Sequence, residues 1–125
     1  MPDREQAGSA EIHYGQGLVH GVKAIDKLCM RGQAAGDIEL CVAEQQLISV
    51  DTVRDLENLH ADGILGLSPR GSEHFLSKLK ASQKIQKKVL SFSLEAGLMT
   101  IGGYDAARFS RDQNTQVEWF PIHSN

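Results

Sequence analysis

Hydrophobic and polar residues alternate along much of the chain, and glycine-containing segments interrupt the alternation. Ile12 and Tyr14 alternate with polar neighbours, and an extended pattern resumes at Leu18 and continues to Met30. Between these runs lies Gly15-Gln16-Gly17, whose two glycines allow the chain to reverse. The pattern therefore predicts a β-hairpin over residues 11–30.

The pattern predicts a further strand beyond this hairpin. Residues 31–37 contain two glycines and no apolar anchor, which is typical of a loop. Strand character returns over residues 38–50, where apolar residues recur. Residues 51–60 fit either a loop or a short helical turn, and the pattern does not decide between them.

One helix is expected, in the second half of the chain. Phe75, Leu76 and Leu79 fall at helical spacing, with Ser72 as the expected N-cap and Glu73 near the positive end of the helix dipole. The predicted helix spans residues 73–82. Apolar runs then predict strands over the ranges 89–94, 98–101 and 117–122. With about seven strands, one helix and no strand-helix alternation, the sequence predicts a mostly antiparallel β fold.

A short apolar run, Ala61-Asp62-Gly63-Ile64-Leu65-Gly66-Leu67, is the most unusual local feature. Asp62-Gly63 is a strong turn signal, and the three large apolar residues after it are expected to be buried. A glycine between them weakens a strand unless another segment approaches the backbone closely. Gly66 therefore predicts a site of close approach.

Composition limits the classes of function. The chain has 125 residues, 41% of them hydrophobic, which suits one domain or one lobe of a larger protein. A net charge of -3 argues against a nucleic-acid partner. No apolar run approaches the roughly 20 residues of a membrane span. Residues 1–10 form a polar lead-in, so we expect no signal or transit peptide here and any secretory signal outside this chain.

Cys29 and Cys41 lie on predicted strands that flank the 31–37 loop. Cysteines near facing ends of neighbouring strands can reach the separation that a disulfide needs, and a bridge would contribute on the order of 3 kcal/mol in the chain-entropy account. We predict a Cys29–Cys41 disulfide, which implies an oxidising compartment. Two free thiols in a cytosolic protein are the alternative.

Common catalytic and cofactor motifs are absent from the sequence. Gly15-Gln16-Gly17-Leu18-Val19-His20-Gly21 comes near a phosphate-binding glycine loop, but a strand follows it where such a loop must open a helix. The histidines and cysteines lack the spacing of metal ligands, and no Gly-x-Ser-x-Gly motif occurs. We expect no metal and no cofactor.

Five segments in order resemble the pepsin-like aspartic peptidases. They are Tyr14-Gly15-Gln16-Gly17, Ala61-Asp62-Gly63-Ile64-Leu65-Gly66-Leu67-Ser68-Pro69, Ser91-Phe92-Ser93-Leu94, Leu98-Met99-Thr100-Ile101-Gly102-Gly103-Tyr104-Asp105 and Glu118-Trp119-Phe120-Pro121-Ile122. The resemblance covers residues 11–122. It implies part of the N-terminal lobe of a bilobal, mostly β barrel fold with one short helix.

The resemblance also implies roles for particular residues. Hairpin 11–30 would be the flap, with Tyr14 over the cleft and Gly15, Gln16 and Gly17 as its tip, all near the substrate. Core loop 61–69 would support the catalytic site through Asp62, Gly63, Ile64, Leu65 and Gly66. Residues 117–122, with Trp119 and Pro121, would form the strand that joins the two lobes.

The sequence departs from the family in one essential respect. Pepsin-like enzymes take one aspartate from each lobe, in Asp-Thr-Gly or Asp-Ser-Gly triplets, and residues 1–125 contain neither triplet. Asp51-Thr52-Val53 is the nearest string, but Val53 replaces the required glycine and the string follows the flap, so we do not expect Asp51 to be catalytic. The chain is therefore expected to be a middle piece that lacks segments of its parent chain and is inactive alone.

Two functions follow from the resemblance. The first is aspartic-type endopeptidase, acting on peptide or protein substrates by an aspartate pair and an activated water. The alternative is a non-catalytic homologue that binds peptides or a protein partner. The resemblance and the expected disulfide place the parent in the secretory pathway, in a lysosome or vacuole, or outside the cell.

Overall fold

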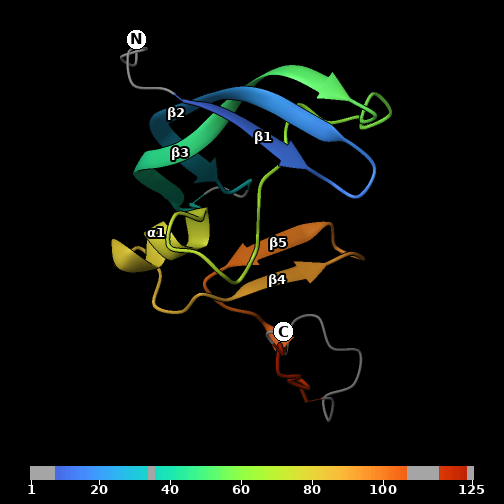
Figure 1. Ribbon diagram of the computed structural model, residues 1–125. Coiled ribbons are helices and arrows are strands. Elements are labelled where there is room, and N and C mark those ends of the chain that lie inside the picture. The colour runs from blue at the N-terminus through green and yellow to red at the C-terminus, as the bar shows by residue number, and fades with distance from the viewer. Residues whose placement is uncertain (1–7, 34–35, 107–115, 124–125) are drawn as a thin grey trace. The chain divides into compact units, whose positions relative to one another are not determined.

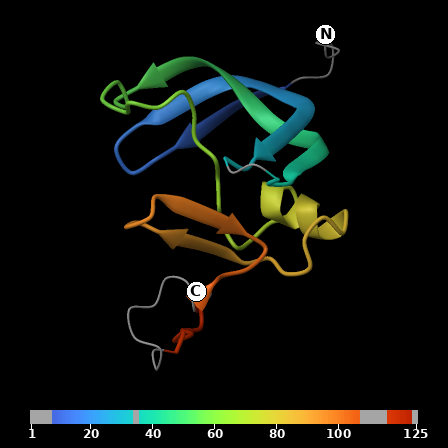
Figure 2. The same ribbon diagram turned by 180° about the vertical axis from the view of Figure 1, so that it is seen from behind.

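Strands β1 (Ser9–His13), β2 (Leu18–Arg31) and β3 (Glu39–Arg54) form an antiparallel sheet in the order β1-β2-β3 (Figures 1 and 2). They belong to the computed structural model of the chain, which describes residues 8–33, 36–106 and 116–123. The chain divides into two units, Met1–Lys84 (unit 1) and Ile85–Asn125 (unit 2). The sheet and the helix lie in unit 1.

The predicted hairpin is present, formed by β1 and β2. Its turn is closed by two backbone hydrogen bonds between Tyr14 and Gly17, with N···O distances of 2.6 and 3.3 Å. Neither glycine of the tip has a positive φ. At Gly17 the side chain is excluded for lack of space, because a Cβ atom would meet the backbone oxygens of Arg54 and Asp55. Gly17 therefore lets the hairpin tip lie against the end of β3.

The long β2–β3 ladder has two register shifts, one between His20 and Gly21 and one between Asp26 and Leu28. His20 pairs with Thr52 while Gly21 pairs with Val50, so Asp51 is an extra residue in β3. Such a bulge bends a strand and strengthens its twist. The strand nevertheless continues to Arg54. The segment 51–54, which the sequence left undecided between loop and helical turn, is thus strand.

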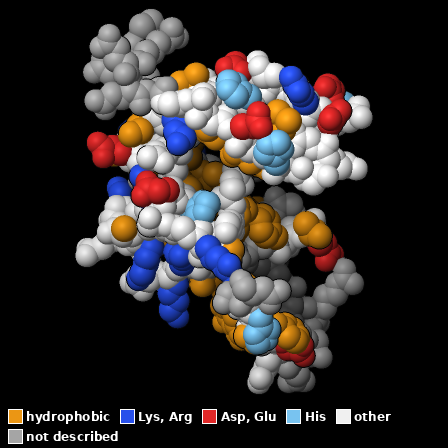
Figure 3. Space-filling view, viewed as in Figure 1, with side chains coloured by type: hydrophobic (Ala, Val, Ile, Leu, Met, Phe, Trp, Pro, Cys, Tyr) orange, Lys and Arg blue, Asp and Glu red, His pale blue; other side chains and the backbone are white. Residues whose placement is uncertain are grey.

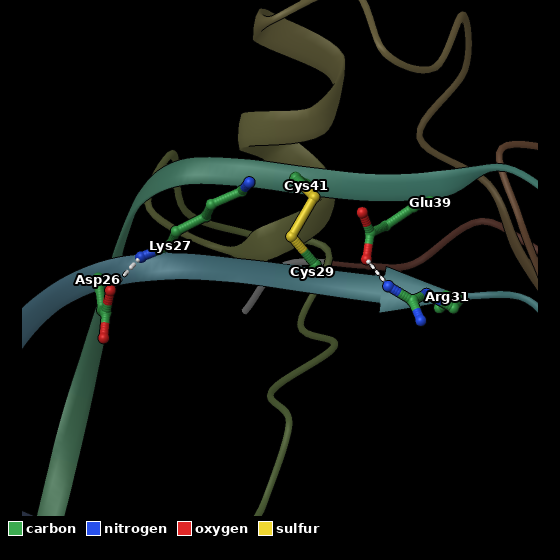
Figure 4. Close-up of a disulfide and its surroundings, with 6 residues drawn as sticks. All are labelled: Asp26, Lys27, Cys29, Arg31, Glu39 and Cys41. Atoms are coloured by element: carbon green, nitrogen blue, oxygen red, sulfur yellow. Dashed lines mark hydrogen bonds and ion pairs between the residues drawn. A yellow bond between two sulfur atoms is a disulfide. The ribbon is translucent and has the colours of Figure 1, made fainter.

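The predicted disulfide between Cys29 and Cys41 is confirmed. The two cysteines are directly opposite each other in the register of β2 and β3, with Cα atoms 4.0 Å apart (Figure 4). Two residues further along each strand toward the loop, Arg31 donates to Glu39 with an N···O distance of 3.0 Å. The bridge therefore joins β2 and β3 beside the loop that connects them.

Helix α1 (Phe75–Ala81) is shorter than the predicted range 73–82. Ser72 is not its N-cap: His74 occupies that position, and no side chain caps the helix there. The Ser72 hydroxyl donates instead to the carboxylate of its neighbour Glu73. At the other end, the amides of Gln83 and Lys84 donate to the carbonyls of Lys80 and Leu79, which is the Schellman pattern of a helix end.

The buried apolar residues of unit 1 lie on its strands and on its helix. Val19 and Val42 are buried on the strands, and Phe75 and Leu79 are buried on the helix. Two hydrogen bonds join the elements. They run from Gln45 Nε2 to the Glu73 carbonyl at 2.9 Å and from Lys78 Nζ to the Glu44 carbonyl at 2.7 Å.

Unit 2 is built on a hairpin of β4 (Leu90–Ser93) and β5 (Leu98–Ile101). Its turn includes Gly97, with a φ of 62°. Ile85 is buried and would contact a Cβ atom at Gly102. The predicted strand over residues 117–122 is not formed. A strand needs a hydrogen-bonding neighbour, and these residues have no ladder partner among those that the structure describes.

The prediction of a mostly β fold with one short helix is confirmed: the described ranges hold five strands in two antiparallel sheets and one α-helix. This is consistent with part of a pepsin-like lobe. No helix within those ranges is long and apolar enough to cross a membrane.

Candidate functional site

A cleft of about 1140 Å³ lies within unit 1. Its lining comes from all three strands of the sheet, from residues between 56 and 66, and from the segment 73–75 at the start of the helix. Most of these side chains are apolar. The cleft thus brings residues of the hairpin and of the 61–67 segment to one surface, although they are far apart in the sequence.

Tyr14 is the residue of the hairpin tip that lines the cleft. It follows β1 directly and is half-buried. Gly15, Gln16 and Gly17 are not among the lining residues. Of the four residues assigned to the tip by resemblance, Tyr14 alone is in the lining of the cleft.

All five core-loop residues line the same cleft: Asp62, Gly63, Ile64, Leu65 and Gly66. The segment forms no strand, and Ile64, Leu65 and Leu67 are 51%, 38% and 36% exposed. The expectation that these apolar side chains are buried is wrong for this chain, because no segment that the structure describes covers them. Ile64 and Leu65 instead line the cleft as part of its apolar wall.

Gly66 does not mark a close approach, contrary to the expectation from the sequence. The nearest atom to a Cβ at this position would be Nδ1 of His74, 4.0 Å away. The close contacts of the sheet lie elsewhere, at Gly17 and at Gly21, where a Cβ would meet the Ser49 carbonyl oxygen. Gly17 lies in the hairpin turn, and Gly21 lies at the register shift that follows His20.

Gln45 and Glu73 are polar residues in the lining of the cleft. Gln45 is buried, and its amide nitrogen donates to the carbonyls of Gln46 and Glu73, both at 2.9 Å. These bonds fix the amide and leave Oε1 buried without a hydrogen-bond partner in the described part of the chain. A hydrogen bond and the charge of Lys78, whose Nζ lies 2.9 Å from Oε2, lower the pKa of Glu73.

Asp51 lies at the bulge in β3 and is exposed. Its Oδ1 is 3.1 Å from Nδ1 of His20 and accepts a hydrogen bond from the Thr52 hydroxyl at 2.8 Å. The contact with His20, followed by that with Thr52, lowers the pKa of the Asp51 carboxyl group. No second carboxylate among the described residues shares this contact, so the geometry matches an exposed histidine–carboxylate contact and not an aspartate dyad.

Possible metal ligands come together beside the disulfide. Cys29, Glu39 and Cys41 offer ligand atoms within 4.8 Å of one another. Both sulfur atoms are joined in the disulfide, however, and metal ions bind cysteine as the thiolate. Glu39 is in addition paired with Arg31. This cluster therefore offers no thiolate ligand to a metal.

Sequence reasoning missed a second pocket, which lies within unit 2. Phe92, Tyr104 and Trp119 line it together. The sequence showed each of these aromatic residues inside a family motif, but a spacing of 12 and then 15 positions carries no periodic signal. Only the fold brings the three rings to one place.

Comparison with known proteins gives one match. The sequence profile of the family described as eukaryotic aspartyl protease matches residues 3–124. No curated protein and no solved structure matches the chain significantly.

Proposed function

This chain belongs to the eukaryotic aspartyl protease family, and on that premise we propose that it is the flap and core-loop portion of an aspartic-type endopeptidase. In this proposal Tyr14 covers bound substrate, and the core loop 61–69 supports a catalytic aspartate. The observation that carries the proposal is the shared cleft: Tyr14 and all five residues from Asp62 to Gly66 line it.

Peptide hydrolysis by such an enzyme requires two carboxylates that share a proton. The charged aspartate activates water while the protonated one donates to the substrate carbonyl, and their mutual repulsion separates the two apparent pKa values. Residues 1–125 contain neither an Asp-Thr-Gly nor an Asp-Ser-Gly triplet, and Asp51 is occupied with His20 and Thr52. We infer that the aspartate pair comes from polypeptide outside these residues and that the chain alone is inactive.

The disulfide supports an oxidising compartment for the parent protein. A Cys29–Cys41 bridge between neighbouring strands persists in oxidising environments. Together with family membership, it supports the secretory pathway, a lysosome or vacuole, or the cell exterior as the place where the parent protein acts.

The large apolar cleft favours a second candidate function. A non-catalytic homologue could bind peptides there without an aspartate pair, since apolar walls with a few polar groups are typical of binding sites. The sequence of the transcript that encodes this chain discriminates between the two. Aspartate triplets in frame on both sides support the endopeptidase, and a reading frame without them favours the binding module.

The role of Tyr14 can be tested in the product of that reading frame if it carries both triplets. We expect cleavage of peptides at acidic pH. Replacement Tyr14→Ala should lower kcat/KM on the order of 10- to 100-fold, the scale of a misplaced reacting group. Gln16→Ala is the matched control, because Gln16 lies in the same turn but outside the cleft lining. Equal kcat/KM for wild type and Tyr14→Ala would show that Tyr14 does not act as a flap residue.

A further inference from the structure

The face of the sheet that points away from the cleft carries histidine and carboxylate side chains near the hairpin turn. Tyr14 and Val19 line the cleft, and side chains alternate between the two faces of a strand, so their neighbours His13 and His20 lie on the opposite face. Glu11 precedes His13 by two residues and shares this face. Histidine and acidic side chains lie side by side over the sheet in Figure 3.

Two histidine–carboxylate contacts lie on this outer face. His13 Nε2 is 2.6 Å from Glu11 Oε1, and His20 Nδ1 is 3.1 Å from Asp51 Oδ1. The Thr52 hydroxyl donates to the same Asp51 oxygen at 2.8 Å. The four ionisable side chains are 40–70% exposed. We call these five residues the outer-face network.

His20 is the central residue of the network, which spans all three strands of the sheet. Glu11 of β1 and Thr52 of β3 are its directly opposite partners, and Asp51 is the extra residue beside Thr52. Directly opposite residues have Cβ atoms about 4.5–5.5 Å apart, so carboxylates flank His20 from both neighbouring strands. A neutral imidazole has one N–H donor, whereas an imidazolium has two. Only the protonated ring can therefore donate to Glu11 and Asp51 at once.

The register also places Arg54 of β3 on this face. Arg54 is opposite Leu18, which is opposite His13 on its other side, so Leu18 separates the two cationic groups. A guanidinium keeps its charge at any pH that a folded protein tolerates. Arg54 thus adds a constant charge beside His20 and no pH dependence. Leu18 and Val22, which flank His20 on the same face of β2, are uncharged.

The charge of such a network changes between acidic and neutral pH. Imidazole groups ordinarily gain a proton as the pH falls from about 8 to about 5, a range in which carboxyl groups ordinarily stay ionised. A protonated ring attracts the carboxylate beside it, whereas a neutral ring keeps a hydrogen bond at most. The hydrogen bond with His20, followed by that with Thr52, lowers the pKa of Asp51. This carboxylate therefore keeps its charge further into acid.

We propose that the outer-face network is a pH-dependent device, which stabilises the β1–β2 hairpin in acid and weakens it as the histidines lose their charge toward neutral pH. Strand β1 has five residues and pairs with β2 alone in the described part of the chain. A hairpin of that size is marginal by itself, so contacts of modest strength change its stability.

The network acts on the strand that positions the flap tyrosine. His13 is the last residue of β1 and directly precedes Tyr14. A hairpin that is ordered in acid holds Tyr14 at the cleft under the conditions in which an aspartic peptidase works. This consequence for substrate rests on the proposed function, whereas the pH dependence of the hairpin does not.

Hydrogen exchange of the 125-residue chain, read by NMR at about pH 5 and about pH 7.5, tests the proposal. Protection factors, which remove the intrinsic pH dependence of exchange, are compared for the amides of residues 9–20. We expect them to be about two- to tenfold higher at the acidic pH, the scale of two exposed charge pairs. The double variant His13→Gln with His20→Gln should lose this difference. No difference in the wild type, or an equal difference in the double variant, overturns the proposal.

A second ion pair of the same sheet provides a matched control. Glu39 pairs with Arg31 across β2 and β3, with an N···O distance of 3.0 Å, and arginine keeps its charge at both pH values. Glu39→Gln should therefore leave the pH dependence of residues 9–20 unchanged. Glu11→Gln, the same chemical change beside a histidine, should reduce it. Equal losses of pH dependence in these two variants would contradict the assignment.

A permanent positive charge separates the effect of charge from the effect of side-chain loss. In His13→Arg with His20→Arg, we expect the hairpin to keep at neutral pH the protection that it has in acid. If circular dichroism shows that the glutamine double variant has lost its fold, the arginine variant decides, and a pH dependence that persists in it overturns the proposal. None of these measurements needs peptidase activity. A parent without aspartate triplets would therefore remove the proposed function and leave this result unaffected.

Discussion

Unit 1 and unit 2 are both antiparallel β structures, but they differ in how much of their apolar surface is covered. Unit 1 pairs strands of 5, 14 and 16 residues, carries a disulfide and buries Phe75 and Leu79 from its helix. In unit 2 each of the two strands has four residues. Leu94, Trp119, Phe120 and Ile122 of this unit are 68–93% exposed.

This difference shows what stabilises a β structure and holds its register. A long ladder with a cross-link holds its register by its own contacts, whereas a two-stranded hairpin alone is marginal in water. The bulk of the stabilising contacts should therefore lie in unit 1.

Truncation of a buried side chain in unit 1 should give the largest effect. Leu79 is fully buried, with 0% exposure, so Leu79→Ala should lower the free energy of unfolding by about 2–5 kcal/mol through lost transfer energy and a cavity. Leu94→Ala is the control in unit 2. Its side chain is 93% exposed, so we expect a change within about 0.5 kcal/mol. Denaturant unfolding measures both, and similar losses would remove the contrast between the units.

Removal of the disulfide should also destabilise mainly unit 1. The double replacement Cys29→Ala with Cys41→Ala should cost about 2–4 kcal/mol of unfolding free energy. Hydrogen exchange read by mass spectrometry should show faster exchange in β2 and β3, with β4 and β5 unchanged. Faster exchange in β4 and β5 alone would contradict the placement of the stabilising cross-link.

Two glycines of unit 1 differ in how closely other atoms approach them. At Gly21 a Cβ would meet the Ser49 carbonyl oxygen and would lie 2.8 Å from Ile48 Cγ2, so Gly21→Ala should destabilise by about 1–3 kcal/mol. Gly66→Ala is the matched control, with its nearest neighbour 4.0 Å away and an expected change within about 0.5 kcal/mol. Thermal unfolding compares them. A larger loss at Gly66 would show that a segment approaches it after all.

The smallest effect concerns the exposed bulge. His20 holds the pKa of Asp51 below its ordinary value. The carboxylate therefore stabilises the fold at pH above the unfolded-state pKa, and that contribution is lost as the pH falls through the lower folded-state pKa. Replacement His20→Gln should raise the Asp51 midpoint in an NMR titration, and Thr52→Val should raise it less. An unchanged midpoint in His20→Gln would show that the contact does not form in solution.

Local signals in the sequence predicted the hairpin and the disulfide, because both depend on residues close together in the chain. The end of β3 was missed because Asp51 is an extra residue that breaks the alternation. Ser72 was expected to cap the helix, yet His74 holds that position. Hydrogen bonds join Gln45 to Glu73, just before the helix, and Lys78 of the helix to Glu44. Such contacts between distant residues are not visible in a single sequence.

The candidate site shows the same limit. Resemblance named Tyr14 and the segment 62–66, and these residues do line one cleft. The exposure of Ile64 and Leu65 was not predicted, because an apolar pattern signals a preference for burial and not the presence of a partner segment. The aromatic pocket of unit 2 was missed because the fold alone brings Phe92, Tyr104 and Trp119 together.

The most direct test of the central proposal is a peptidase assay on the purified 125-residue chain. The chain is incubated at acidic pH with an unfolded protein substrate, with and without pepstatin, and the products are read by mass spectrometry. We predict no pepstatin-sensitive cleavage, because the chain contains the cleft but neither aspartate triplet. Pepstatin-sensitive cleavage by this chain alone would contradict the proposal that its catalytic pair lies outside these residues.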